Sequence, residues 1–369
     1  MENFTKVFTS EIQIFLDEFN VLKIFIYQLW FAIILFGLAS NTLNITVFVS
    51  LGLKDSVTVT LLFLSVSDLI NLLLNIPMAI ARCIGETYPD HQWPIDRNIL
   101  YYLLYWPAVV FYDFSSFIAV FLAVVRCLCV ARPLRFKSMF TPGRTVTILL
   151  SLFLAAFIFR GPVLVTNSLG WAVNPRTNAT FVYLRHLDNS EELFKVNDIF
   201  NRNIVSWMAY ITAITCLVIL TSSLLAASRF RQSAQVANNA GPADIRQSTP
   251  GAGNSAVKGE RPDSSLSGKD LQVVQSVTLI CAVFIVSQLP FQTISMVRLF
   301  QPGFGFNEKT RVALRFANHI SNTCGYLNAS VNIFLYYRFN SRYRKTLCSF
   351  LPKWIFASQD SPTEGGSKR

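Results

Sequence analysis

Charged residues are scarce in this sequence. Asp, Glu, Lys and Arg make up 14% of the 369 residues and hydrophobic residues 52%, whereas a soluble domain is roughly 25% charged. An ordinary soluble domain is therefore excluded. A helix needs about 20 mostly apolar residues to cross a bilayer. Seven stretches meet that length and predict an all-α membrane protein, a seven-transmembrane helix bundle over 25–337, with spans at about 25–51, 57–82, 98–131, 143–166, 203–229, 271–299 and 311–337.

The sequence also lacks the pattern of a removable signal peptide. The start MENFTKVFTSEIQIF has no basic stretch followed by an apolar one and a small-residue cleavage site, so we expect the first span to direct insertion. Basic residues concentrate in the first, third and fifth connections and after the last span, which predicts that these segments are cytoplasmic. We therefore expect a multi-pass plasma-membrane protein with residues 1–24 extracellular. The acceptors Asn3 and Asn178 would then carry glycans.

Low-complexity segments and a basic helix complete the predicted organisation. Residues 231–268 are rich in Gly, Pro, Ser, Asn and Gln, and we expect this cytoplasmic loop and the tail 350–369 to be disordered. Residues 338–349 should form a short amphipathic cytoplasmic helix, in which Cys348 is a predicted palmitoylation site. The formal net charge is +11, and the excess basic residues lie in segments that flank the apolar spans. This placement favours membrane lipid as a partner and not nucleic acid.

Polar residues occur inside six of the seven spans, where each needs a partner or a water-filled space. A carboxylate ringed by hydroxyl and amide oxygens could hold a small hard cation, and a hydrogen-bonded network without an ion is the alternative. Asp113 and Arg160 lie at similar depth, so we expect them to neutralise each other; the competing use is as a counter-charge for a ligand. The other polar residues at depth are Asn41, Asp68, Ser115, Gln288, Asn322, Asn328 and Asn332.

Five short motifs occur in order along the chain. They are SNTLN (40–44), LSVSDL (64–69), VRC followed by ARPL after the third span, FIVSQLPF (284–291) and NIFLYY (332–337). With these motifs the chain resembles the rhodopsin-like (class A) G-protein-coupled receptors. The stretches RCLCVARPLRFKSMFTPGRT and LGWAVNPRTNAT are similar to the gastropod (molluscan) chemosensory receptor group, which is related to peptide receptors. The resemblance implies an extracellular ligand, either an odorant or a neuropeptide, and a heterotrimeric G protein activated by outward movement of the sixth helix.

The resemblance also implies an allosteric sodium ion. Its ligands would be Asp68, Ser115, Asn328 and Asn332, and no other cofactor is expected. Two family positions differ here: Gln288 replaces the usual tryptophan two residues before Pro290, and isoleucine follows Asn332 where the family has proline.

The resemblance implies that Arg126 is a switch residue at the G-protein interface. In most of the family an acid precedes this arginine, but here Val125 does. The family often carries a second acid at the inner end of the sixth helix, which is Asp270 here. We therefore predict an Arg126–Asp270 bridge and appreciable basal signalling, with Pro290, Asn332 and Tyr336 as further switch residues.

Several family features are missing. Tyr101 replaces the cysteine that usually joins the third span to the outer loop, and residues 167–201 contain no cysteine. An alanine at position 108 argues against amine binding, and the seventh span has no lysine to bind retinal. The ligand pocket is expected to contain Trp106, Tyr112, Asp113, Gln288, Phe291, Gln292, Asn318, His319 and Asn322.

Two other classes of protein fit the sequence less well. No phosphate loop, zinc-protease helix or hydrolase elbow occurs, so no enzyme is predicted. A transporter or channel is the alternative function, with Asp68, Asp113 and Arg160 lining its pathway. The chain shows no internal repeat, which disfavours transporters built from duplicated halves.

Overall fold

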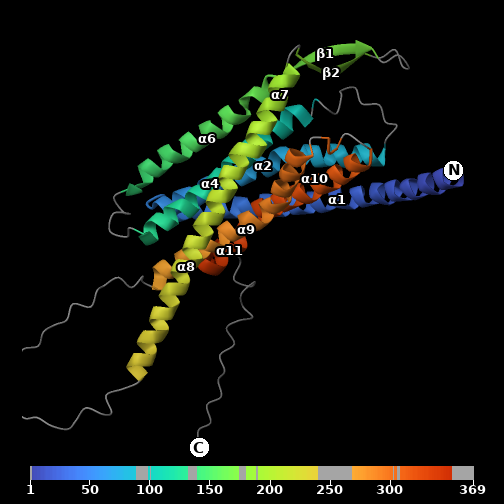
Figure 1. The fold of residues 1–369 in the computed structure, drawn as a ribbon. Coiled ribbons are helices and arrows are strands. Elements are labelled where there is room, and N and C mark those ends of the chain that lie inside the picture. The colour runs from blue at the N-terminus through green and yellow to red at the C-terminus, as the bar shows by residue number, and fades with distance from the viewer. Residues whose placement is uncertain are drawn as a thin grey trace, which may run out of the picture.

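The structure is a computed structural model, and most of it is a bundle of long helices (Figure 1). It describes residues 2–88, 99, 101–131, 139–173, 180–187, 190–239, 268–301, 303–305 and 308–350. Its elements are α1 (Glu2–Leu51), α2 (Ser56–Thr87), η1 (Tyr101–Tyr105), α4 (Trp106–Ala131), α6 (Pro142–Leu164), β1 (Asn167–Val173), β2 (Thr180–His186), α7 (Ser190–Ile199), η2 (Phe200–Val205), α8 (Ser206–Asn239), α9 (Gly268–Phe300), α10 (Glu308–Ser330), α11 (Asn332–Phe339) and α12 (Ser341–Phe350).

Within the described residues, six helical stretches are long and apolar enough to cross a membrane. They are Leu22–Leu51, Ser56–Gly85, Tyr102–Cys129, Pro142–Leu164, Glu192–Ala226 and Val277–Phe300. The seventh membrane helix is the more polar α10, continued by α11, and the short helix α12 follows it. The predicted fold, a seven-helix bundle with a further helix after the last span, is confirmed.

The seventh helix is interrupted at Val331. The backbone N–H of Phe334 donates to the carbonyl of Val331 at 3.1 Å, a three-residue spacing that tightens the chain between α10 and α11. The α-helical pattern is therefore broken just before Asn332 although isoleucine stands at position 333, where the family has proline. The local distortion does not depend on a proline ring.

Three segments differ clearly from what was expected. α1 begins at Glu2, so the segment 1–24 is largely helical, and α8 continues to Asn239, past the start of the predicted loop at residue 231. Residues 167–201 were expected to be a polar loop. They instead contain the antiparallel hairpin β1–β2, with Gly170 opposite Tyr183, and then α7.

Some predictions lie outside the described residues. These are the disorder of 240–267 and of 351–369 and the glycosylation of Asn178; α1 includes Asn3, but the side chain of Asn3 is not described. All seven cysteines are free thiols, Cys348 among them on α12.

Glycine at position 37 lets α1 approach α2 and α10 closely. A Cβ atom there would overlap the side chains of Leu72 and Ser330, which are 0% and 1% exposed and have no space to withdraw. The same three helices share the aromatic cluster of Tyr27 and Trp30. Close packing without a side chain at Gly37 thus sets the spacing of this side of the bundle.

We predict that Gly37→Ala destabilises the protein, because the cost of adding even one methyl group to a closely packed core is about 1–3 kcal/mol. The matched control is Gly161→Ala on α6, where nothing lies within 4 Å of an added Cβ. The measurement is the unfolding temperature of the purified protein in detergent. Equal unfolding temperatures for the two variants would show that the α1 contact is looser than described.

Candidate functional site

A buried carboxylate lies at the middle of the bundle. Asp68 on α2 is 1% exposed. It accepts hydrogen bonds from the hydroxyl of Ser115 on α4 at 2.6 Å and from the amide of Asn332 on α11 at 3.0 Å. Asn328, the fourth predicted sodium ligand, lies on α10 one helical turn before Asn332, across the break at Val331. Three helices are therefore joined through one acid.

The oxygen atoms around Asp68 suit a small hard cation. A carboxylate and a hydroxyl are ligand types that such ions take, whereas Asn332 directs its NH₂ group to Asp68. No cluster of three or more His, Cys, Asp or Glu residues suited to a metal ion occurs in the described part of the chain. The carboxylate of Asp68 and the hydroxyl of Ser115 thus fit an alkali ion completed by water.

Arg126, the predicted switch residue, lies near the C-terminal end of α4. Arg126 is on α4 and is 6% exposed, and Tyr336 on α11 is 1% exposed and packs against Phe48 and Tyr343. Asp270 lies in the first turn of α9, but its side chain is outside the described residues. The Arg126–Asp270 bridge therefore stays a prediction.

Two adjoining cavities open toward the other end of the bundle. The deep cavity, with a volume of about 150 Å³, has walls from α2, η1, α4, α6, α7, η2, α8, α9 and α10. The outer cavity, of about 690 Å³, shares Trp106, Phe291 and Asn322 with it. Every residue predicted for the ligand pocket lines one of the two: Trp106, Tyr112, Asp113, Gln288, Phe291, Gln292 and Asn322 line the deep cavity, and Asn318 and His319 line the outer one.

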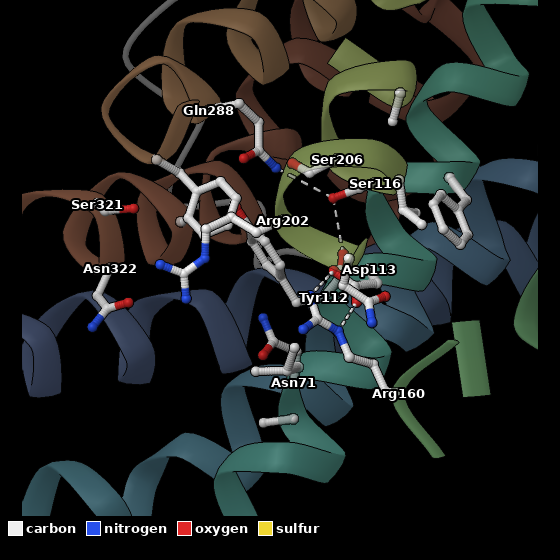
Figure 2. Close-up of a pocket in the computed structure, with 18 of the residues that line it drawn as sticks. Asn71, Tyr112, Asp113, Ser116, Arg160, Arg202, Ser206, Gln288, Ser321 and Asn322 are labelled. Carbon is white, nitrogen blue, oxygen red and sulfur yellow. Dashed lines mark hydrogen bonds and ion pairs between the residues drawn. The ribbon is translucent and has the colours of Figure 1, made fainter. Parts of the chain in front are cut away.

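An ion pair forms part of the deep cavity wall. Nε of Arg160 on α6 lies 2.6 Å from a carboxylate oxygen of Asp113 on α4, and the side chains are only 10% and 19% exposed. Figure 2 shows the pair on one side of the cavity and Gln288 joined to Ser116 on another. The predicted pairing of Asp113 with Arg160 is confirmed, and it neutralises both charges.

A second ion pair was missed by the sequence analysis. Arg202 donates to both carboxylate oxygens of Asp198 at 2.8 Å, one helical turn away. Both residues line both cavities. The signal was an acid and an arginine spaced i, i+4, but it fell at the end of the segment assigned to a loop.

Buried amides and hydroxyls also line the deep cavity without having been predicted. Asn75 donates to Asn71 at 3.1 Å and accepts from Tyr326 at 3.0 Å, which joins α2 to α10. Asn201 donates to the carbonyl of Phe159 on α6. Asparagines inside apolar spans were the available signal, and those at 71 and 75 were overlooked. Ser116, Ser206 and Ser321 complete the added polar lining.

The arrangement is that of a helical membrane protein with a ligand-sized cavity at one end and a buried polar network at its centre. A family model described as 7 transmembrane receptor (rhodopsin family) matches residues 40–336. The chain belongs to this rhodopsin family of seven-transmembrane receptors. A search of curated proteins finds no match, so the finer likeness to gastropod chemosensory receptors stays a prediction.

We predict that each single change Asp113→Asn and Arg160→Gln destabilises the protein by about 3 kcal/mol or more, because each leaves one buried charge unpaired. The double variant Asp113→Asn/Arg160→Gln should lose less than the sum. The charge swap Asp113→Arg/Arg160→Asp should recover part of the stability that Asp113→Arg loses. Unfolding temperatures of purified variants provide the measurement. A swap as unstable as Asp113→Arg alone would contradict direct pairing.

Proposed function

We propose that the protein is a G-protein-coupled receptor of the plasma membrane with its N-terminus outside. A ligand enters through the outer cavity and occupies the deep one, and a heterotrimeric G protein couples at the opposite end. The observation that carries this proposal is the path of α9. The same helix lines the deep cavity at Gln288, Phe291 and Gln292 and, at its other end, carries Asp270.

The helix is built to bend between these two ends. Pro290 lies inside α9 and cannot donate a backbone hydrogen bond. One turn and a half below it, Phe284 lines the deep cavity and packs with Ala119 of α4 and Ala213 of α8. A ligand that presses on this side chain shifts α9 against two neighbours, which moves its inner half outward.

The central polar network supplies a restraint on this movement. A sodium ion held by Asp68, Ser115, Asn328 and Asn332 would tie α2, α4 and the seventh helix together and favour the inactive arrangement. Because ion and agonist favour different arrangements, each lowers the affinity for the other.

The ligand proposed from the sequence is an odorant or a neuropeptide. The deep cavity combines aromatic side chains with a few fixed polar groups, as small-molecule and peptide-end sites do. Trp106 packs edge-on against Phe194 of α7 where the two cavities meet. Glycans on Asn3 and Asn178, a palmitate on Cys348 and contact of the basic inner segments with anionic lipid complete the proposal.

The deciding experiment is a ligand screen of the expressed full-length receptor in cells with a promiscuous Gα. Ligand-evoked calcium or cAMP signals should disappear in matched cells without Gα. A ligand-dependent current that persists without Gα would instead establish the alternative function, a channel.

We predict that Asp68→Asn removes the sodium dependence of agonist affinity, because the neutral amide no longer attracts the ion. In the unchanged receptor, replacing sodium by a large organic cation at constant ionic strength should raise agonist affinity. Radioligand competition measures both. An unchanged sodium effect in Asp68→Asn would exclude this carboxylate as the ion's ligand.

We predict that Asp270→Asn raises basal G-protein signalling, because it removes the acid expected to hold Arg126. A suitable control is Asp55→Asn, at the start of α2, where the amide can still cap the helix. Ligand-free nucleotide exchange, normalised to surface expression, is the readout. Equal basal rates in Asp270→Asn and the unchanged receptor would disprove the bridge.

A further inference from the structure

Two glutamine side chains on α9 face the deep cavity. Gln288 and Gln292 are 4% and 2% exposed, and both line this cavity. They are four residues apart, so they lie on one face of the helix about 6 Å from each other. Their carbonyl oxygens, Oε1 in each case, are buried without a hydrogen-bond donor among the described residues.

The orientation of the Gln288 amide follows from its neighbours. The hydroxyl of Ser116 donates its single hydrogen to the carbonyl of Tyr112 at 3.0 Å. With its hydrogen on that carbonyl, the hydroxyl accepts from Gln288, whose Nε2 lies 3.3 Å away. The NH₂ group is held by Ser116, and the carbonyl oxygen is left for another donor.

The orientation of the Gln292 amide is determined in the same way. Its Nε2 lies 2.6 Å from the hydroxyl of Ser206 and 3.4 Å from the backbone carbonyl of Ser206. A backbone carbonyl accepts only, so the group that faces it is NH₂. Two buried acceptors thus belong to residues that line the deep cavity, and buried acceptors are costly to leave unmatched.

The charges around the deep cavity decide what kind of donor suits these oxygens. Both acids among its described lining residues are engaged, Asp113 by Arg160 and Asp198 by Arg202. A cationic group on the ligand would therefore enter a low-dielectric space without a free counter-charge. A neutral N–H or O–H donor matches the cavity better than an ammonium group.

The outer cavity has a different charge balance. Among its described lining residues Asp198 is the one acid, and it is already paired with Arg202, whereas the other cationic residues of this lining include Arg298 and Arg315. Arg298 lies in the last turn of α9, and Arg315 lies on α10, on the neighbouring wall. Charges of one sign that line a cavity concentrate the field inside it, which favours an anion here.

We infer that the ligand is an anion with a neutral hydrogen-bond donor at its opposite end. Its acidic group lies in the outer cavity against Arg298 and Arg315, and its donor reaches Gln288 and Gln292 in the deep cavity. A primary carboxamide suits the inner position, because its two N–H groups can serve both oxygens. An acidic peptide with an amidated end has this chemistry. The inference rests on the proposed function, in which these cavities receive the ligand.

The test uses the purified full-length receptor and a library of N-acetylated di- and tripeptides ending in a primary amide. Each member that contains Asp or Glu is matched by its Asn or Gln counterpart and by its N,N-dimethylamide. We expect acidic primary amides to raise the unfolding temperature of the receptor. Their dissociation constants should be about tenfold lower than those of either counterpart, as for a charge-assisted hydrogen bond or an unmatched buried acceptor.

Variants locate each preference on the receptor. Arg298→Gln/Arg315→Gln should abolish the preference for acidic over neutral members, whereas the control Arg311→Gln, on the same helix as Arg315 but outside both cavities, should retain it. Gln288→Met/Gln292→Met should abolish the preference for primary amides over dimethylamides. Its control is Gln28→Met on the exposed face of α1. If a variant fails to fold, the matched pairs on the unchanged receptor still decide.

Three results would overturn the inference: neutral or basic members that bind as well as acidic ones, dimethylamides that bind as well as primary amides, or no binding of any acidic primary amide at millimolar concentration. Signalling is scored separately in cells. Acidic amides that bind without activating a G protein would contradict the proposed function and leave the ligand class intact. Activation by basic ligands would contradict the ligand class and leave the proposed function intact.

Discussion

A carboxylate within a membrane must be hydrogen-bonded by side chains of neighbouring helices, and the rest of the bundle depends on this constraint. In lipid, helices satisfy their own backbone groups, so polar side chains at depth bond to one another. Asp68 does so through Ser115 on α4 and Asn332 on α11. The break at Val331 places Asn332 at the start of a new helix. Packing against Gly37, aromatic contacts around Tyr336 and the sodium chemistry proposed for this centre are all arranged around that link.

The outer half follows the same rule with a different result. Its acids are neutralised by arginines, Asp113 by Arg160 and Asp198 by Arg202. Because these pairs neutralise the charges of the deep cavity, we propose that ligand recognition depends on the amides of α9 and on the arginines farther out. The helix that presents those amides also carries Pro290. The proposal thus places ligand recognition and the proline of the moving helix within one element.

The sequence predicted the number of spans, the fold and the Asp113–Arg160 pair, because long apolar stretches and costly charges at depth leave few alternatives. It failed where local composition was not decisive. Residues 167–201 look polar and loop-like, yet part of them forms the β1–β2 hairpin and α7. Composition alone does not show that two neighbouring polar segments pair as strands. The partners of Gln288 and Gln292 are serines on other helices, and side-chain contacts between helices depend on packing that no single segment encodes.

The central claim is that α9 moves outward at its inner end when a G protein couples. Its most direct test is the distance between spin labels at Gln275 on α9 and Arg342 on α12, both exposed, in the receptor reconstituted in lipid nanodiscs. A purified, nucleotide-free G protein is added without ligand. A partner that binds the active arrangement more tightly shifts the receptor toward that arrangement even when no ligand is present. The account predicts a longer distance with the G protein bound. An unchanged distance distribution in a complex whose formation is verified would contradict it.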